Sequence, residues 1–166
     1  FCGLSGMALS PQFYPNMNKP LPFSLSHATL GDLSQMRIIE KACFPLDAWP
    51  LLELIAVLIL PNLVKIKAEV DQKMVGFIGG DAHRGEGVGW ITTLGVLPQF
   101  QRMGIASALL RQCEDEMNMP VVKLTVRRSN FGAQRLYFNH GYRQVDVWER
   151  YYEGGEDGLI LEKRIS

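Results

Sequence analysis

The sequence predicts a mixed α/β domain, and three observations lead to that class. Apolar and polar residues alternate in several short segments, as in half-buried strands, and elsewhere apolar residues recur with helical spacing. These segments follow one another in the order β-α-α-β-β-β-α-β-α-β-β, which predicts a central mixed sheet of about seven strands with about four helices. The length of 166 residues suits one domain of ordinary size.

The composition is that of a folded domain without a bias in charge. Hydrophobic residues make up 47% and charged residues 20%, which excludes a disordered or fibrous chain. Lysine plus arginine equals aspartate plus glutamate at 17 each, so bulk charge gives no reason to expect a general nucleic-acid or membrane-surface binder. The longest apolar run, Leu54–Leu60, is too short to span a membrane, which predicts a soluble protein.

The cysteines and the chain start give two further expectations. Cys2, Cys43 and Cys113 are too scattered for a disulfide framework or a zinc pattern, and we expect buried thiols in a cytoplasmic protein. Residues 1–22 hold four prolines and no regular period, so we expect a loose extension before a single domain over residues 23–166. Because Phe1 is not a natural start, further residues are expected upstream.

The domain is expected to begin with one strand and two helices. Phe23–His27 alternates apolar and polar side chains, as a half-buried strand does. Thr29 opens a capping pattern for an amphipathic helix that runs to about residue 44. A second helix is expected from Asp47 or Ala48 through Leu60, where a proline follows.

Three strands should follow, joined by tight turns. Leu63–Val70 and Met74–Ala82 are predicted neighbours on either side of a turn at Gln72-Lys73. Gly85–Gly87 turns the chain again, into a strand over Val88–Val96.

The last part of the chain predicts two helices between strands. Gly104–Met117 has an apolar stripe at helical spacing, and Val121–Val126 is rich in β-branched residues. Asn130 is a helix cap, and a glycine after His140 provides the left-handed stop. Strands at Tyr142–Trp148 and Gly158–Glu162 close the domain.

The most informative segment is the junction of strand and helix at Gln101–Ala106. The first N–H groups of a helix lack intrahelical partners, and with the helix dipole they form an anion site. Gly104 lets the backbone approach a phosphate, Ala106 keeps the next contact small, and Arg102 adds positive charge. A glycine at a helix start can also be only a turn residue.

The same segment resembles the Q/R-x-x-G-x-G/A signature of the GNAT superfamily of acetyl-CoA-dependent N-acetyltransferases. The resemblance covers nearly all of residues 23–165, because the order of elements also matches the GNAT acyl-CoA N-acyltransferase fold. Within the superfamily the chain resembles the RimI-type enzymes that acetylate the N-terminus of a ribosomal protein. Three stretches carry this closer likeness: Ile39–Pro45 with Trp49, Val126–Asn130, and Arg150–Tyr152 with Glu156 and Asp157.

The resemblance implies a binding site for acetyl-CoA. Leu94, Gly95 and Val96 match the strand that holds the pantetheine arm, and the Val96 N–H matches the group that faces the thioester carbonyl. The pyrophosphate would lie against the matched loop, which comprises Gln101, Arg102, Met103, Gly104, Ile105 and Ala106. Asn130 matches a residue that contacts the pantetheine arm, and as a helix cap it could serve both roles.

The resemblance also assigns a general acid and leaves the base open. Tyr137 matches the residue that protonates the leaving thiolate, and the resemblance favours this role over that of a core tyrosine packed on Ala133, which the residue alone would suggest. RimI-type enzymes carry glutamate, and some relatives histidine, where this chain has Thr125, which cannot act as a base near neutral pH. An α-amine, whose pKa is about 7.7–8.0, tolerates that loss better than a lysine side chain does.

Three further residues are candidates for the acceptor side of the site. Glu40, Tyr151 and Tyr152 could line an acceptor groove, or they could be a solvated helix face and a packed aromatic pair. His83 should lie opposite Val88, about 23 Å of strand from the reaction centre, and is read as a rim residue. The other histidines are expected to be structural or solvated.

These observations predict an N-acetyltransferase that moves the acetyl group of acetyl-CoA to a protein N-terminal α-amine by direct attack. A lysine side chain or a small amine is the alternative acceptor. A non-catalytic acyl-CoA-binding module is the alternative from another class. We expect no metal, no nucleic-acid partner and no membrane association, and a monomer or homodimer.

Overall fold

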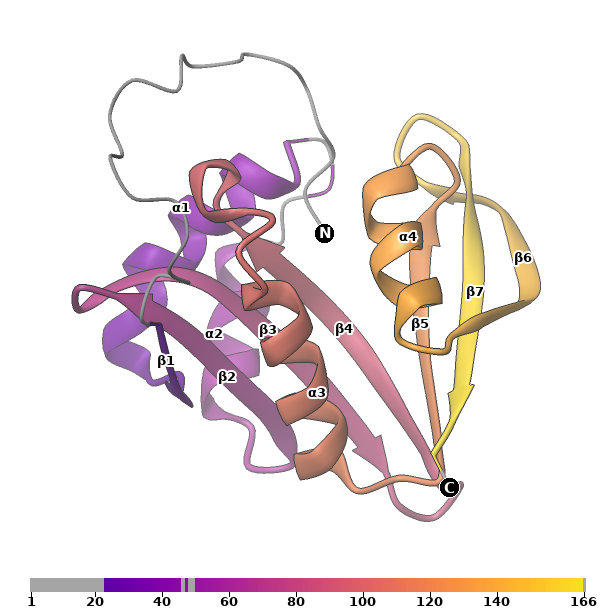
Figure 1. Ribbon diagram of the computed structural model, residues 1–166, viewed down its shortest axis with the longest axis horizontal. Helices are drawn as coiled ribbons and strands as arrows, with labels where there is room; N and C mark the ends of the chain where they lie inside the picture. Colours follow the sequence, from indigo (N-terminus) through magenta and orange to yellow (C-terminus); the bar gives the residue numbers. More distant parts are fainter. Residues whose placement is uncertain (1–22, 46, 48–49, 166) are drawn as a thin grey trace.

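The computed structural model describes residues 23–45, 47 and 50–165, which build a seven-stranded sheet in the order β1-β2-β3-β4-β5-β7-β6 (Figure 1). Neighbouring strands are antiparallel except for the parallel pair β4 and β5. The mixed sheet agrees with the prediction. The strands are β1 Ser24–His27, β2 Leu63–Val70, β3 Lys73–His83, β4 Val88–Val96, β5 Val121–Arg127, β6 Arg143–Tyr152 and β7 Glu156–Arg164.

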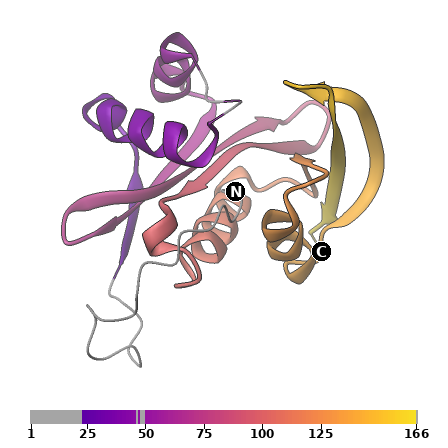
Figure 2. The same ribbon diagram turned by 90° about the horizontal axis from the view of Figure 1, so that it is seen from above.

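Helices cover both faces of the sheet (Figure 2). They are α1 Leu33–Cys43, α2 Leu51–Ile59, α3 Ile105–Met117 and α4 Phe131–Asn139, with short 3-10 turns η1 Leu30–Asp32 and η2 Pro98–Phe100. Figure 2 shows α1 and α2 on one face and α3 and α4 on the other. Each face has its own apolar core, a smaller one under α1 and α2 and a larger one under α3 and α4. None of the helices in the described ranges is long and apolar enough to cross a membrane.

Close packing of α3 on the sheet depends on Gly80 of β3. A β-carbon added there would lie 2.7 Å from the Cys113 sulfur and 2.8 Å from the Met117 sulfur. Only a residue without a side chain therefore lets α3 approach the sheet this closely. Cys113 itself is buried, as expected.

Four sequence predictions need correction. Helix α2 begins at Leu51, after an extended Pro50, and not at residue 47 or 48; Ala48 and Trp49 lie outside the described residues, as do residues 1–22. The turn after β2 is at Asp71 and Gln72, which both have positive φ. Turn η2 was not expected.

The fourth correction concerns the last two strands. Strand β6 continues to Tyr152 and β7 begins at Glu156, so Tyr151 and Tyr152 belong to a strand and not to the loop. A register shift between Trp148 and Tyr152 lets the strand bend and continue past the predicted end.

Candidate active site

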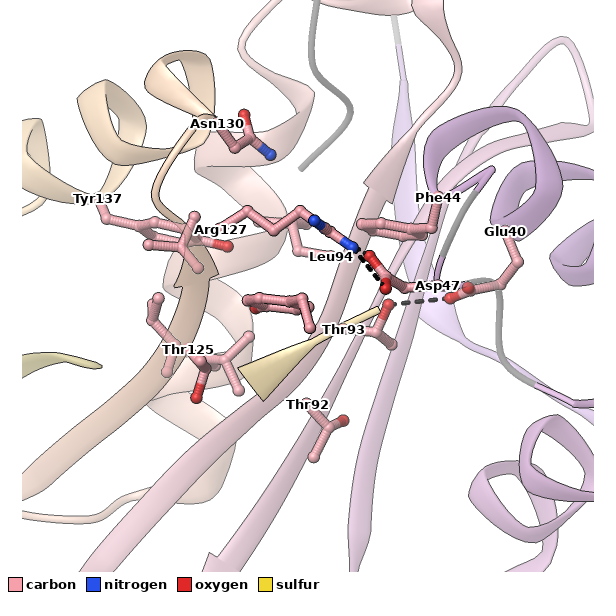
Figure 3. Close-up of a pocket in the computed structure, with 14 residues that line it drawn as sticks. Glu40, Phe44, Asp47, Thr92, Thr93, Leu94, Thr125, Arg127, Asn130 and Tyr137 are labelled. Carbon is pink, nitrogen blue, oxygen red and sulfur yellow. Dashed lines mark hydrogen bonds and ion pairs between the residues drawn. The ribbon is translucent and has the colours of Figure 1, made fainter. Parts of the chain in front are cut away.

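A pocket opens where β4 leaves β5. The two strands pair only from Val88↔Val121 to Ile91↔Leu124, and beyond that point β4 stays with β3 while β5 stays with β7. Figure 1 shows the two strands meeting at one end and diverging toward the other. Side chains from α1, β4, β5, α4 and β6 line the pocket, among them Glu40, Thr93, Thr125, Arg127, Tyr137 and Tyr152 (Figure 3).

The separation of the strands exposes backbone groups of β4 to the pocket side. The Leu97 N–H donates to the Val75 carbonyl at 2.8 Å, which marks a hydrogen-bonded pair of the β3–β4 ladder. Bonded and non-bonded pairs alternate in an antiparallel ladder, so the N–H groups of Val96 and Leu94 point away from β3, toward the gap. By the same alternation the polar backbone of Gly95 faces β3.

Gly95 has a packing role at the contact between α1 and β4. A β-carbon at this position would lie 3.0 Å from the Ile39 side chain, with Phe44 and Cys43 next nearest. The glycine therefore lets α1 press against the end of β4. The Cys43 thiol donates to the Val96 carbonyl at 3.3 Å, which ties the last turn of α1 to the same strand.

The loop between β4 and α3 is shaped for an anion. Gly104 caps α3 in a left-handed conformation with φ of +82°, and a β-carbon there would meet nothing within 4 Å. The first backbone bond of the helix runs from the Ala108 N–H to the Gly104 carbonyl at 3.0 Å. The N–H groups of residues 105–107 thus stand at the positive end of the helix.

The remaining signature residues frame this loop. Arg102 is exposed with φ of +63°, whereas Ile105 and Ala106 are buried and Met103 packs on the larger core. The Gln101 side-chain amide donates to the Val96 carbonyl at 3.0 Å. Gln101 therefore closes the loop onto β4.

Helix α4 brings Asn130 and Tyr137 to the same pocket. The Asn130 side-chain oxygen Oδ1 accepts from the Ala133 N–H at 3.1 Å, so Asn130 caps the helix as predicted. Tyr137 is 4% exposed and packs edge-on against Tyr142 at 5.6 Å between ring centroids. Burial raises the pKa of the Tyr137 phenol, and the group therefore keeps its proton at neutral pH.

Sequence reasoning missed the role of Arg127, which joins the two walls of the pocket. Its guanidinium donates to Asp47 through Nε at 2.6 Å and Nη2 at 2.7 Å, and to Glu156 through Nη1 at 2.6 Å. It also lies over the Tyr152 ring, 4.7 Å from the centroid. Hydrogen bonding to Asp47 raises the pKa of Arg127, which stays charged. The only signal in the sequence was its place in the Val126–Asn130 stretch.

Glu40 lies inside the pocket wall and not on a solvated helix face. It is 1% exposed, and its Oε1 accepts from the Thr93 hydroxyl at 3.0 Å. The sequence held a signal for this burial, because Glu40 stands in the buried stripe of α1 that also comprises Met36, Ile39 and Cys43.

Of the two candidate tyrosines only Tyr152 lines the pocket. Tyr151 is 52% exposed and contacts the Tyr152 ring edge-on, with 5.0 Å between centroids. Trp148 continues this aromatic row from Tyr151 to Trp90 on β4, with centroid distances of 5.1 and 6.0 Å. The row runs from β6 to the middle of β4.

Comparison with known proteins places this site in a family. Residues 33–142 match the Acetyltransferase (GNAT) family, about two thirds of the chain. The chain belongs to this family.

Several relatives share its sequence or its fold. An uncharacterized N-acetyltransferase of Methanocaldococcus jannaschii is 36% identical over 108 residues, which cover 63% of this chain and 67% of that protein. The catalytic subunit NAA10 of the N-terminal acetyltransferase A complex of Arabidopsis thaliana is 30% identical over 86% of this chain and 78% of the relative. The crystal structure of the ribosomal-protein-S18-alanine N-acetyltransferase from Escherichia coli has a TM-score of 0.79 at 24% identity, covering 87% of this chain and 95% of that one, and shows the shared GNAT fold.

The residues of this GNAT domain fit acetyl-CoA. The open space at Gly104 and the N–H groups of the first turn of α3 suit a pyrophosphate. Val96 and Leu94 direct backbone groups to the gap between β4 and β5, where a pantetheine arm could add its amides like a missing strand. Tyr137 lines the same gap.

The three histidines of the chain lie away from the pocket. No histidine is among the described residues that line the pocket. His83 pairs with Val88 at the far end of β4, as predicted, while His27 bonds to Glu116 and His140 to Ser107. Thr125 lines the pocket from β5. Within the described ranges there is also no group of three or more His, Cys, Asp or Glu that could hold a metal ion.

Proposed function

We propose that the protein acetylates the N-terminal α-amine of a protein or peptide with acetyl-CoA. The single observation that carries the proposal is the pocket between β4 and β5, which brings Tyr137 beside strand β4 where the Val96 N–H points away from β3. The name of the Arabidopsis relative, the catalytic subunit of an N-terminal acetyltransferase, supports the α-amine as acceptor.

Each residue of the site has a defined task in this reaction. When bound, acetyl-CoA supplies a thioester, an activated acetyl group. The residue 104–107 turn binds its phosphates, and the Val96 N–H donates to the thioester oxygen as negative charge grows there. A C–N bond forms as the acceptor nitrogen attacks the carbonyl carbon. The C–S bond then breaks while the Tyr137 hydroxyl gives its proton to the sulfur, and a proton released by the nitrogen restores the phenol.

The acceptor preference follows from the pKa of the amine. An α-amine with a pKa of about 7.7–8.0 is partly neutral at pH 7, whereas a lysine amine near 10.4 is almost fully protonated. Thr125 offers the site no basic group on β5. A site with this limited help therefore suits an α-amine better than a lysine side chain. A purely acyl-CoA-binding module would have no use for a buried phenol at the splayed strands.

A matched set of peptides tests the proposal. One form of each peptide has a free N-terminus and no lysine, and the other has a blocked N-terminus and one internal lysine. Small polyamines are tested as a third class of acceptor. We expect acetylation of the free N-terminus, located by fragment mass spectrometry. Preferred acetylation of the lysine peptide or of a polyamine would replace this assignment, and acetyl-CoA binding without turnover on any amine would indicate a binding module.

We also propose that the protein acts in the cytoplasm. The two described cysteines, Cys43 and Cys113, are buried side chains in the apolar cores, which suits a reducing compartment. Fractionation of cells that make the protein tests the location, and light scattering of the purified protein distinguishes a monomer from a homodimer.

A further inference from the structure

A buried carboxylate faces the acceptor side of the pocket, and the function described above gives it no task. Glu40 lines the pocket at 1% exposure, and the Thr93 hydroxyl donates to it at 3.0 Å. Removing a carboxylate from water is costly, and the hydrogen bond from Thr93 offsets part of that cost while it fixes the position of the carboxylate in the pocket wall. Figure 3 shows Glu40 reaching from α1 toward Thr93 on β4.

The fold places this carboxylate on the opposite side of the sheet from the general acid. Glu40 comes from α1, which lies on one face, and Tyr137 comes from α4, which lies on the other (Figure 2). The anion-binding turn at the start of α3 is on the α4 side. An acceptor that enters from the α1 side therefore meets Glu40, while the leaving sulfur meets Tyr137.

Contacts of α1 with β4 hold Glu40 close to the reacting strand. The Cys43 thiol bonds to the Val96 carbonyl, and Ile39 packs where Gly95 has no side chain. One of these contacts precedes Glu40 in the sequence and the other follows it. The packing of α1 on β4 therefore holds the Glu40 carboxylate against Thr93. Thr93 is three residues before Val96, about 10 Å along the strand, a span that an amine and one water can bridge.

The other charged and titratable groups that line the pocket are an aspartate paired with an arginine and two phenols. Asp47, from the segment before α2, is held by two nitrogens of Arg127, which also binds Glu156 of β7. Tyr137 from α4 and Tyr152 from β6 are phenols whose pKa values burial raises. The described residues of β4 that line the pocket, 91–94, carry no titratable side chain.

We propose that Glu40 is the base that accepts a proton from the acceptor ammonium, directly or through one water, and that Thr93 is a positioning residue for its carboxylate. This inference rests on the proposed function. The N–H bond of the ammonium breaks, an O–H bond forms on Glu40, and the neutral amine then attacks the thioester. The proton on Glu40 passes to water after the product leaves, which restores the carboxylate.

The pH dependence of a Glu40→Gln variant tests the inference, with Glu86→Gln as the matched control. Glu86 is an exposed glutamate in the turn before β4, at the end of that strand far from the pocket. At pH 6.5 we expect Glu40→Gln to lower kcat/KM about 10²–10⁴-fold with acetyl-CoA affinity unchanged. At pH 9 the α-amine is neutral without help, so the loss should shrink to about tenfold or less. Glu86→Gln should match the parent at both pH values.

A chemical rescue separates a proton acceptor from a structural or binding carboxylate. A peptide that ends in an aminooxy group carries a nucleophile that is already neutral at pH 6.5. Glu40→Gln should acetylate this peptide at a rate close to that of the parent. An equal loss at both pH values, or no rescue, would overturn the assignment of Glu40 as the base.

Two further results keep the outcomes distinct. If Glu40→Gln does not fold by circular dichroism, Thr93→Val replaces it, and a smaller loss with the same pH trend is expected; a loss that does not change with pH overturns the inference. If the parent acetylates no N-terminal peptide, the proposed function fails. If the parent acetylates the peptides and Glu40→Gln behaves like Glu86→Gln, only the present inference fails.

Discussion

The two ends of β4 consist of similar residues and serve different purposes. From Val88 to Ile91 the strand is hydrogen-bonded on both sides, to β3 and to β5. From Thr92 to Val96 it keeps only β3, and the described pocket occupies the other side. Both halves are rich in β-branched and apolar side chains, so strand propensity does not distinguish them.

The difference between the ends lies in the chain that follows. At the closed end β5 begins at Val121 and runs beside β4, under the tightly packed C-terminal part of α3. At the open end the loop to α3 starts, and β5 turns toward α4 at Asn130. A site is thus built where a ladder of hydrogen bonds stops. The N–H groups of Leu94 and Val96, which a neighbouring strand would have used, point into the gap between β4 and β5.

The largest effect at the open end should come from Tyr137→Phe. The variant keeps the ring that packs on Tyr142 and loses only the acidic proton. We expect kcat to fall about 10²–10⁴-fold with little change in acetyl-CoA affinity, measured by steady-state kinetics and calorimetry. Because burial raises the pKa of this phenol, the parent should show no loss of kcat from Tyr137 ionisation up to pH 9. A near-normal kcat in the variant would remove Tyr137 from the mechanism.

Gly104→Glu should have the next largest effect, again at the open end. A side chain here enters the open space in front of α3 and carries negative charge to the phosphate position. We expect coenzyme A to bind about 100-fold more weakly by calorimetry. Gly104→Ala is the control for backbone strain, because it shares the left-handed φ of +82° without the charge. Equal affinities for the parent and the glutamate variant would contradict the assignment of this turn.

Gly80→Val should act at the closed end and change stability more than chemistry. The added side chain would overlap the sulfur atoms of Cys113 and Met117, two residues of α3. Overpacking of this kind costs about 1–3 kcal/mol, to be measured by urea unfolding. Coenzyme A affinity of the folded fraction should stay within a few fold of the parent. A large loss of coenzyme A affinity without a change in the free energy of unfolding would mean that the closed end of β4 also contributes to coenzyme A binding.

The smallest effect is expected from Thr125→Val, although Thr125 lines the pocket. Its hydroxyl cannot serve as a base near neutral pH, so kcat/KM at pH 8 should fall less than tenfold. A loss greater than about 100-fold would instead assign the hydroxyl a water-holding or proton-relay role. Circular dichroism should confirm that the fold survives.

The elements that local patterns specify could be predicted closely. Strands β2 and β4 have the predicted bounds, because alternation and turn residues mark both ends of each. Helix α2 was predicted too early because its start depends on Pro50, which takes the extended conformation of an N-cap residue. Strand β6 was predicted too short because a shift in register with β7, which alternation of side chains does not reveal, lets it continue to Tyr152.

Local patterns in the chain predicted the order of the elements, the turn at Gly104 and the presence of Asn130 and Tyr137 on one side of α4. Each depends on backbone conformation or on spacing within a few residues, which local chemistry specifies. Packing of the whole domain sets where β4 and β5 separate, buries Glu40 against Thr93 and lets Arg127 join Asp47 to Glu156. These contacts join residues 29 to 80 positions apart, and they exist only after the sheet and its helices have packed.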